Sequence, residues 1–153
     1  MSTTRTDEEL RSDALALQEA LTDLVRAYQF RDREAICCYD VSLGQSHALE
    51  RLLREGSMTM NDFAAALFLE KSSASRLVDG LVKKGYVTRR QDQNDGRFVR
   101  IELTKPGRLL AERLENDLVS ERSALLEDFS ERERRTIVRA LAKLADAVSN
   151  GAS

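Results

Sequence analysis

The sequence predicts a mainly α-helical protein that carries one two-stranded β-hairpin in its second half. Three observations predict this. Apolar residues recur at helical spacing along most of the chain, helix-capping pairs precede several of these stretches, and strand spacing appears only near residues 86–103. The length of 153 residues fits one domain, and the sequence contains no repeat or linker. We therefore expect residues 1–153 to form a single domain.

The first expected element is a long helix from Asp7 to Arg31. Thr6 and Glu9 before it have capping-box spacing. Apolar residues then recur at alternating steps of four and three, at Leu10, Ala14, Leu17, Leu21, Leu24 and Tyr28. This period of 3.5 residues makes a narrow apolar seam, which suits a partner helix.

Three shorter helices are expected next. The first covers residues 43–55 and is opened by a capping box at Ser42. The second begins near the cap Thr59 and turns Phe68 inward along with its other apolar side chains. The third covers residues 72–84.

The chain then changes to the spacing of strands. Residues 86–90 and 98–103 have the composition of strands, and the polar segment between them contains the turn residues Asn94, Asp95 and Gly96. We therefore expect a hairpin whose tip is polar and partly basic.

Two helices complete the expected fold. Thr104 caps the first. The single proline, Pro106, lies in its first turn, where the backbone N–H groups have no acceptor within the helix and proline costs no hydrogen bond. Ser130 and Glu133 form a capping box before the second. Their apolar stripes are Leu110, Leu114, Leu118 and Leu125 in the first, and Ile137, Leu141, Leu144 and Val148 in the second.

Composition argues against several classes of protein. The net charge is −2, from 24 Lys and Arg against 26 Asp and Glu, and no apolar run has the length of a membrane span. The first residues lack the apolar core of a secretion signal, and the adjacent Cys37 and Cys38 cannot build a disulfide framework, so we expect a cytoplasmic chain. Because His47 is the single histidine and no catalytic motif is present, we expect no metal, no cofactor and no enzyme activity.

Positive charge is concentrated in one segment. Residues 71–105 hold nine Lys or Arg and four Asp or Glu, a net charge of +5, whereas the rest of the chain has a net charge of −7. This distribution favours a local surface for a polyanion. A solvated charged face is the alternative interpretation of the charge alone.

Two short helices with a tight connection and a following hairpin describe a winged helix-turn-helix. The motifs within residues 59–107 resemble those of the MarR family of bacterial and archaeal transcription regulators, and the long flanking helices match that family's layout. The motifs are Asn61–Leu67, Ser72–Leu81, Lys84–Val87, the Asp-x-Arg of Asp95-Gly96-Arg97, and Leu103-Thr104-x-x-Gly107. The sequence departs from the family pattern at Gly96, where many relatives carry a second arginine.

The N-terminal turn of the expected recognition helix can reach base edges in the major groove of DNA. It offers the hydroxyls of Ser72, Ser73 and Ser75, and Arg76, which can bind guanine or phosphate. Ser72 has the alternative role of a simple N-cap.

The expected wing adds further cations. Arg97 stands at its tip, where it can enter a narrow A·T-rich minor groove. The family pattern implies that Asp95 holds a wing arginine in place. The candidate phosphate contacts are Lys83, Lys84, Arg89 and Arg90.

Geometry and the resemblance both predict a homodimer, since one recognition helix covers too few base pairs to discriminate among genomic sites. Two copies would read the inverted half-sites of a pseudo-palindromic operator in double-stranded DNA. We expect residues 7–56 and 105–149 to be mainly dimerisation helices and 57–104 to be the DNA-binding lobe. A dimer on a promoter obstructs polymerase, so we expect a repressor. The alternative is a winged-helix module that binds proteins and reads no DNA sequence.

Many relatives respond to small amphipathic or phenolic ligands bound where the dimer helices meet the DNA-binding lobe. The resemblance therefore directs attention to Tyr28, Cys38, Tyr39 and His47 as an effector region, although Tyr28 and His47 also suit core or boundary positions. Cys37 and Cys38 allow a second hypothesis, release by thiol oxidation. That chemistry needs an accessible thiol with a lowered pKa, whereas a buried cysteine packs as a small apolar residue.

Overall fold

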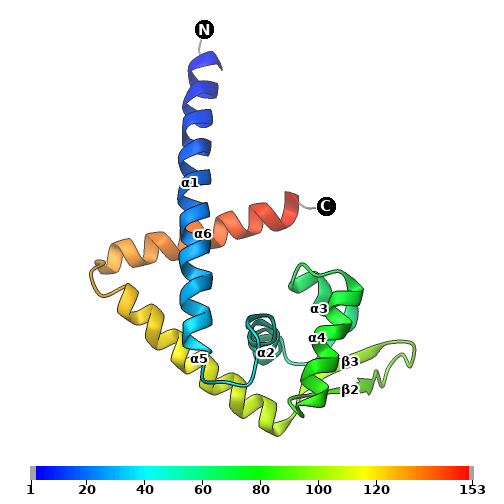
Figure 1. Cartoon of the computed structure of the whole chain (residues 1–153). Helices are drawn as coiled ribbons and strands as arrows, with labels where there is room; N and C mark the ends of the chain where they lie inside the picture. The colour runs from blue at the N-terminus through cyan, green and yellow to red at the C-terminus, as the bar shows by residue number, and fades with distance from the viewer. Residues whose placement is uncertain (1–2, 152–153) are drawn as a thin grey trace. The chain divides into compact units, whose positions relative to one another are not determined.

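The structure, a computed structural model, describes residues 3–151 (Figure 1). Six helices and three strands lie within these residues, in the order α1 Thr3–Ala35, α2 Leu43–Glu55, β1 Met58–Thr59, α3 Met60–Ala66, α4 Lys71–Lys83, β2 Val87–Gln91, β3 Val99–Leu103, α5 Lys105–Leu125 and α6 Glu131–Gly151. The expected winged helix-turn-helix is confirmed: α3 and α4 are its two short helices, and β2 and β3 form its wing (Figure 1). The chain divides into two compact units, one that ends at Glu115 and one that begins at Asn116, and each is described by itself.

The three strands form one antiparallel sheet in the order β1-β3-β2. β2 pairs with β3 along its whole length, with Gln91 opposite Val99 near the tip of the wing. β1 adds a short edge, where Met58 pairs with Ile101. Ile101 is fully buried, so the root of the wing is fixed to the rest of the lobe. The sequence did not predict β1, because two residues are too few for a strand pattern.

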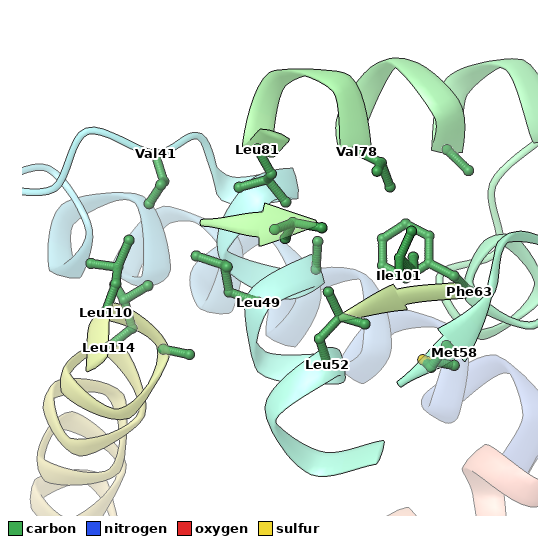
Figure 2. Close-up of a cluster of buried hydrophobic side chains, with 14 of the residues drawn as sticks. Val41, Leu49, Leu52, Met58, Phe63, Val78, Leu81, Ile101, Leu110 and Leu114 are labelled. Carbon is green, nitrogen blue, oxygen red and sulfur yellow. The ribbon is translucent and has the colours of Figure 1, made fainter. Parts of the chain in front are cut away.

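One apolar core joins α2, α3, α4 and the sheet. Its largest fully buried side chains are Leu49, Leu52, Phe63, Val78, Leu81 and Ile101. Figure 2 shows them gathered between these elements, with Leu110 and Leu114 of α5 beside them. Each such side chain stabilises a fold by about 1.5–3 kcal/mol when buried. α4 and the wing therefore stand on a common packed base, and α2 is part of it.

Local capping accounts for most of the helix starts. Ser42 and Gln45 exchange the two hydrogen bonds of the expected capping box, each 3.1 Å long. The hydroxyls of Thr59, Thr104 and Ser130 accept backbone N–H groups at the starts of α3, α5 and α6. These caps are confirmed, because each depends on residues only three positions apart.

Two expected helix starts are wrong. α1 begins three residues before Thr6, and it ends four residues after Arg31 because the segment Asp-Arg-Glu-Ala contains no helix-breaking residue. α4 begins at Lys71, one residue before the expected start, and the N-cap is Glu70, whose extended backbone turns the chain into the helix. Ser72 therefore lies inside the first turn of α4 and is not its N-cap.

The turn between α3 and α4 overturns the inward placement of Phe68. This residue has a φ of +53° and is 72% exposed. Hydrogen bonds from Leu69 N–H to Ala64 O at 2.9 Å and from Phe68 N–H to Ala65 O at 3.1 Å close a Schellman motif. Phe68 thus occupies the left-handed position that glycine usually takes, which directs its ring away from the core.

Candidate nucleic-acid interface

The N-terminal turn of α4 presents small polar side chains and one arginine. Ser72 and Arg76 are exposed, whereas Ser73 and Ser75 are half-buried. No side chain caps the helix, so its first backbone N–H groups are available to an anion, which the helix dipole also favours. Arg76 Nη2 lies 3.5 Å from Ser73 Oγ, a long contact that leaves the other guanidinium donors for an external acceptor.

The wing tip holds an arginine in a defined orientation. Arg97 Nε and Nη2 donate to the two carboxylate oxygens of Asp95 at 3.0 and 2.8 Å, yet the Arg97 side chain is 86% exposed. The guanidinium holds the pKa of Asp95 below its ordinary value, and the carboxylate raises the pKa of Arg97. Both groups therefore stay ionised at neutral pH, and the pair is lost only as the pH falls through the lowered pKa of Asp95.

The start of α4 and the wing tip share one surface. Lys71 and Arg97 line an open hollow of about 280 Å³, together with Thr59, Met60, Asn61, Phe98 and Val99. We name this surface the α4–wing face. Lys71 is a cation that the predicted interface left out, because the helix start was placed one residue too late.

The root of the wing is tied to β1 through Arg100. Arg100 Nε and Nη2 donate to Ser57 Oγ and Ser57 O at 2.6 and 2.7 Å, and Arg100 Nη1 donates to Asp92 Oδ2 at 3.3 Å. Asp92 also accepts the N–H groups of Asn94 and Asp95 at 2.8 and 3.1 Å, and these bonds hold its pKa below the ordinary value. Arg100 is thus a positioning residue for the wing. The sequence held no signal for it, since Ser57 lies 43 positions away.

The turn at the wing tip depends less on Gly96 than the turn residues Asn94, Asp95 and Gly96 in the sequence indicate. Its φ lies outside the left-handed region, and a Cβ added there would meet Gln91 at an ordinary contact distance of 3.5 Å. Its carbonyl oxygen accepts a hydrogen bond from Gln91 Nε2 at 2.9 Å. The turn around it depends on the side chains of Asp92 and Asp95 instead.

Two of the predicted phosphate contacts are paired with acids of the same lobe. Arg89 Nη2 donates to Asp79 Oδ1 at 2.5 Å, which links β2 to α4, and Arg90 Nε lies 2.7 Å from Glu102 Oε1. Lys83 is exposed in the last turn of α4. A phosphate would compete with the carboxylates for Arg89 and Arg90, while Lys83 has no ion pair of this kind in the structure's described part.

Lys84, another predicted phosphate contact, is bonded to acceptors near the connection between α1 and α2. Its Nζ donates to Asp40 O and, at 2.9 Å, to Gln45 Oε1. Tyr86 Oη donates to Asp40 Oδ1 at 2.9 Å, and this bond raises the pKa of Tyr86. These contacts join the connection between α1 and α2 to the residues that link α4 with the wing.

Comparison with known proteins finds similarity to one family of regulators. A sequence profile of the MarR family matches residues 39–97. The uncharacterized HTH-type transcriptional regulator YwhA of Bacillus subtilis is 29% identical over 137 residues, which cover 87% of this chain and 95% of that protein. The HTH-type transcriptional repressor YetL of the same species is 28% identical over 72% of this chain and 78% of its own length. The structure of a MarR family protein from Bacillus stearothermophilus matches with a TM-score of 0.80 and 27% identity, over 91% of this chain and 97% of that one. In sequence and in fold, the chain is similar to transcription regulators of the MarR family.

The proteins that the chain matches are transcription regulators and not enzymes, which supports the same role for this chain. Within residues 3–151, no group of three or more His, Cys, Asp or Glu side chains could hold a metal ion. No helix in the same residues is long and apolar enough to cross a membrane.

One of the predicted effector residues, His47, lines a hollow on the surface. His47 lies 4.0 Å from Asp32 Oδ2 and lines a hollow of about 260 Å³ with Glu50, Arg51, Arg54, Ala66, Leu67 and Phe68. The other residues of the predicted effector region, Tyr28, Cys38 and Tyr39, do not line this hollow. Tyr39 is half-buried, with the guanidinium carbon of Arg113 6.0 Å from its ring centre.

The two cysteines are exposed, and their sulfur atoms lie 3.6 Å apart. The neighbouring Cys38 raises the pKa of the Cys37 thiol, through a hydrogen bond and through its charge when ionised. A raised pKa keeps this thiol protonated at neutral pH. This property disfavours the low-pKa thiolate that the oxidation hypothesis needs.

Proposed function

We propose that this protein is a dimeric, sequence-specific DNA-binding repressor that a small ligand releases from its operator. The observation that carries the proposal is the α4–wing face, where Lys71 and the exposed Arg97 line one hollow beside the uncapped start of α4. The similarity to MarR-family regulators supports the DNA-binding role, and the name of the relative YetL supports repression.

In the proposed complex the N-terminal turn of α4 enters the major groove. Ser72, Ser73, Ser75 and Arg76 then face base edges or phosphates. Arg97, oriented by Asp95, enters the adjacent minor groove, and Gly96 leaves room beside it. The contacts that position the protein without reading bases are Lys71, Lys83, Arg89 and Arg90.

Selection of bound duplexes from a random pool tests the sequence-specific part of the proposal, and salt titration on the recovered site measures the phosphate contacts. Arg97→Ala should weaken binding, mainly at A·T-rich flanks, and reduce the slope of log K against log salt by about 0.9 for each of the two copies of Arg97 in the dimer. Arg76→Ala should remove the site preference or most of the affinity. The charge-matched control Arg54→Ala alters an exposed α2 pair with Glu50 and should bind like the parent.

The interface assignment is wrong if both Arg76→Ala and Arg97→Ala bind like the parent protein. A pool that yields no preferred sequence, with binding insensitive to salt, would favour the winged-helix module that binds proteins.

Exposed apolar stripes support the homodimer. The α1 seam residues Leu10, Leu17, Leu24 and Tyr28 are 41–67% exposed, and α6 has no buried residue in the described range. Monomeric proteins rarely expose apolar stripes of this extent. We propose α1, α5 and α6 as dimerisation helices. The DNA-binding lobe then begins at α2 instead of residue 57, since Leu49 and Leu52 are buried in its core.

The effector proposal rests on the family resemblance and on the hollow beside His47. A panel of amphipathic and phenolic compounds should include some that lower the affinity for the operator, measured by fluorescence anisotropy of labelled DNA. His47→Ala should reduce this response without changing DNA affinity in the absence of ligand. A panel with no effect on the parent protein would contradict release by this class of ligand.

A further inference from the structure

Two thiols lie side by side where α1 ends. Cys37 and Cys38 are both exposed, and their Sγ atoms are 3.6 Å apart. We propose that this pair is a binding site for a trivalent organoarsenical, which would bridge the two sulfur atoms. The proposed DNA-binding function plays no part in this inference.

The backbone around the pair is held in a turn. Ile36 N–H donates to Asp32 O at 3.1 Å, Cys37 N–H donates to Glu34 O at 3.3 Å, and Tyr39 N–H donates to Ile36 O at 2.9 Å. Ile36 is buried and Tyr39 is half-buried, so both ends of the turn are anchored in the lobe while the two cysteines between them face solvent. The thiols are thus brought together before any ligand arrives, which lowers the entropy cost of chelation.

The spacing and the number of sulfur atoms favour one class of ligand. Thiolates select soft, thiophilic centres. At metal–sulfur bonds of about 2.3 Å, two sulfurs on one tetrahedral centre lie about 3.8 Å apart, close to the observed 3.6 Å. A linear two-coordinate ion would need a sulfur–sulfur distance of twice the metal–sulfur bond length, which is longer than the distance observed here. Zinc prefers four ligands, and no third His, Cys, Asp or Glu completes a metal cluster within residues 3–151.

A monosubstituted trivalent arsenical meets these requirements, because its organic group fills the third position on arsenic. The arsenoxide reacts with both thiols, so that two arsenic–sulfur bonds form and the arsenic–oxygen bond breaks. The oxygen leaves as water with the two thiol protons, and arsenic stays trivalent. Since no thiolate has to exist beforehand, the reaction is compatible with the protonated state of Cys37.

Phenylarsine oxide is the probe. Intact-mass measurement of the full chain, in excess glutathione, should show one phenylarsine per chain, with the mass of the probe less one water. Titration of free thiols should show that both cysteines are consumed, and 2,3-dimercaptopropanol should remove the probe. Cys37→Ser and Cys38→Ser should each bind at least about 10²-fold more weakly, because the second bond of the parent is intramolecular.

The helical circular dichroism of each variant serves as the folding control, and Ser42→Ala, with both thiols intact, should bind the probe like the parent. The proposal is overturned if either single-cysteine variant holds the probe as tightly as the parent, or if glutathione prevents all binding to the parent. Neither result depends on DNA, so the regulator proposal is tested separately.

Discussion

At the scale of single residues, Gly107 lies where an added side chain would overlap the backbone of a neighbouring segment. A Cβ there would overlap the Tyr86 carbonyl oxygen and lie 2.7 Å from its carbonyl carbon. This carbonyl cannot easily move, because it accepts the Thr104 N–H at 3.0 Å. We expect Gly107→Ala to lower the free energy of unfolding by about 1–3 kcal/mol or more, measured by urea denaturation.

Gly96→Ala is the matched control, since its added methyl group would meet Gln91 at an ordinary distance. It should change the free energy of unfolding by less than about 0.5 kcal/mol. Equal changes in the two variants would contradict the overlap with Tyr86, because alanine otherwise favours a helix over glycine and restricts the unfolded chain.

Residue roles could be predicted from the sequence where the partners are close in the chain. The pair of Asp95 and Arg97 spans two positions and falls in a recognisable motif. Lys84 and Arg100 could not be assigned in this way, because their acceptors lie about forty positions earlier and meet them only in the folded lobe. The sequence alone therefore does not distinguish a basic residue that faces DNA from one that supports the wing.

At the scale of elements, two neighbouring arginines of the wing differ in exposure and in their bonding partners. Arg90 and Arg100 are direct partners across β2 and β3, but the Arg100 side chain is 39% exposed and bonded to Ser57 and Asp92, whereas Arg90 is 72% exposed. We expect Arg100→Ala to lower the free energy of unfolding by about 1–2 kcal/mol, because Ser57 and Asp92 lose a charged donor. Arg90→Ala should cost less than about 1 kcal/mol.

Salt titration of DNA binding distinguishes a structural role of Arg100 in the wing from a direct contact between Arg100 and a phosphate. Arg100→Ala should weaken binding through a loosened wing and leave the slope of log K against log salt unchanged. A slope reduced as strongly as in Arg97→Ala would mean that Arg100 itself neutralises a phosphate.

Element types were predictable because helix caps and strand alternation are local signals, and α2 is bounded as the sequence predicts. The early start of α4 and the outward orientation of Phe68 could not be predicted from such signals. Both follow from the Schellman turn at Phe68, where a phenylalanine takes the conformation that the sequence pattern associates with glycine. β1 depends on pairing with β3, which lies more than forty residues later.

At the scale of the whole molecule, the apolar seam of α1 is the feature that a single chain leaves unexplained. A period of 3.5 residues is typical of helices that pack on a partner helix, and Leu17 within this seam is 42% exposed. We expect Leu17→Glu to shift the molar mass in light scattering from that of a dimer to that of a monomer. Affinity for a palindromic operator should fall by at least about 10²-fold, because two linked half-site contacts become one.

The control is Glu19→Gln, which changes a charge two positions along the helix and away from the seam. It should leave both mass and affinity unchanged. The buried residues of the DNA-binding lobe are all distant in sequence from Leu17, so Leu17→Glu should retain weak, salt-sensitive binding to a single half-site.

A parent protein that is monomeric at micromolar concentration would remove the dimer from the proposal. Operator recognition would then have to come from one copy of α4 and one wing.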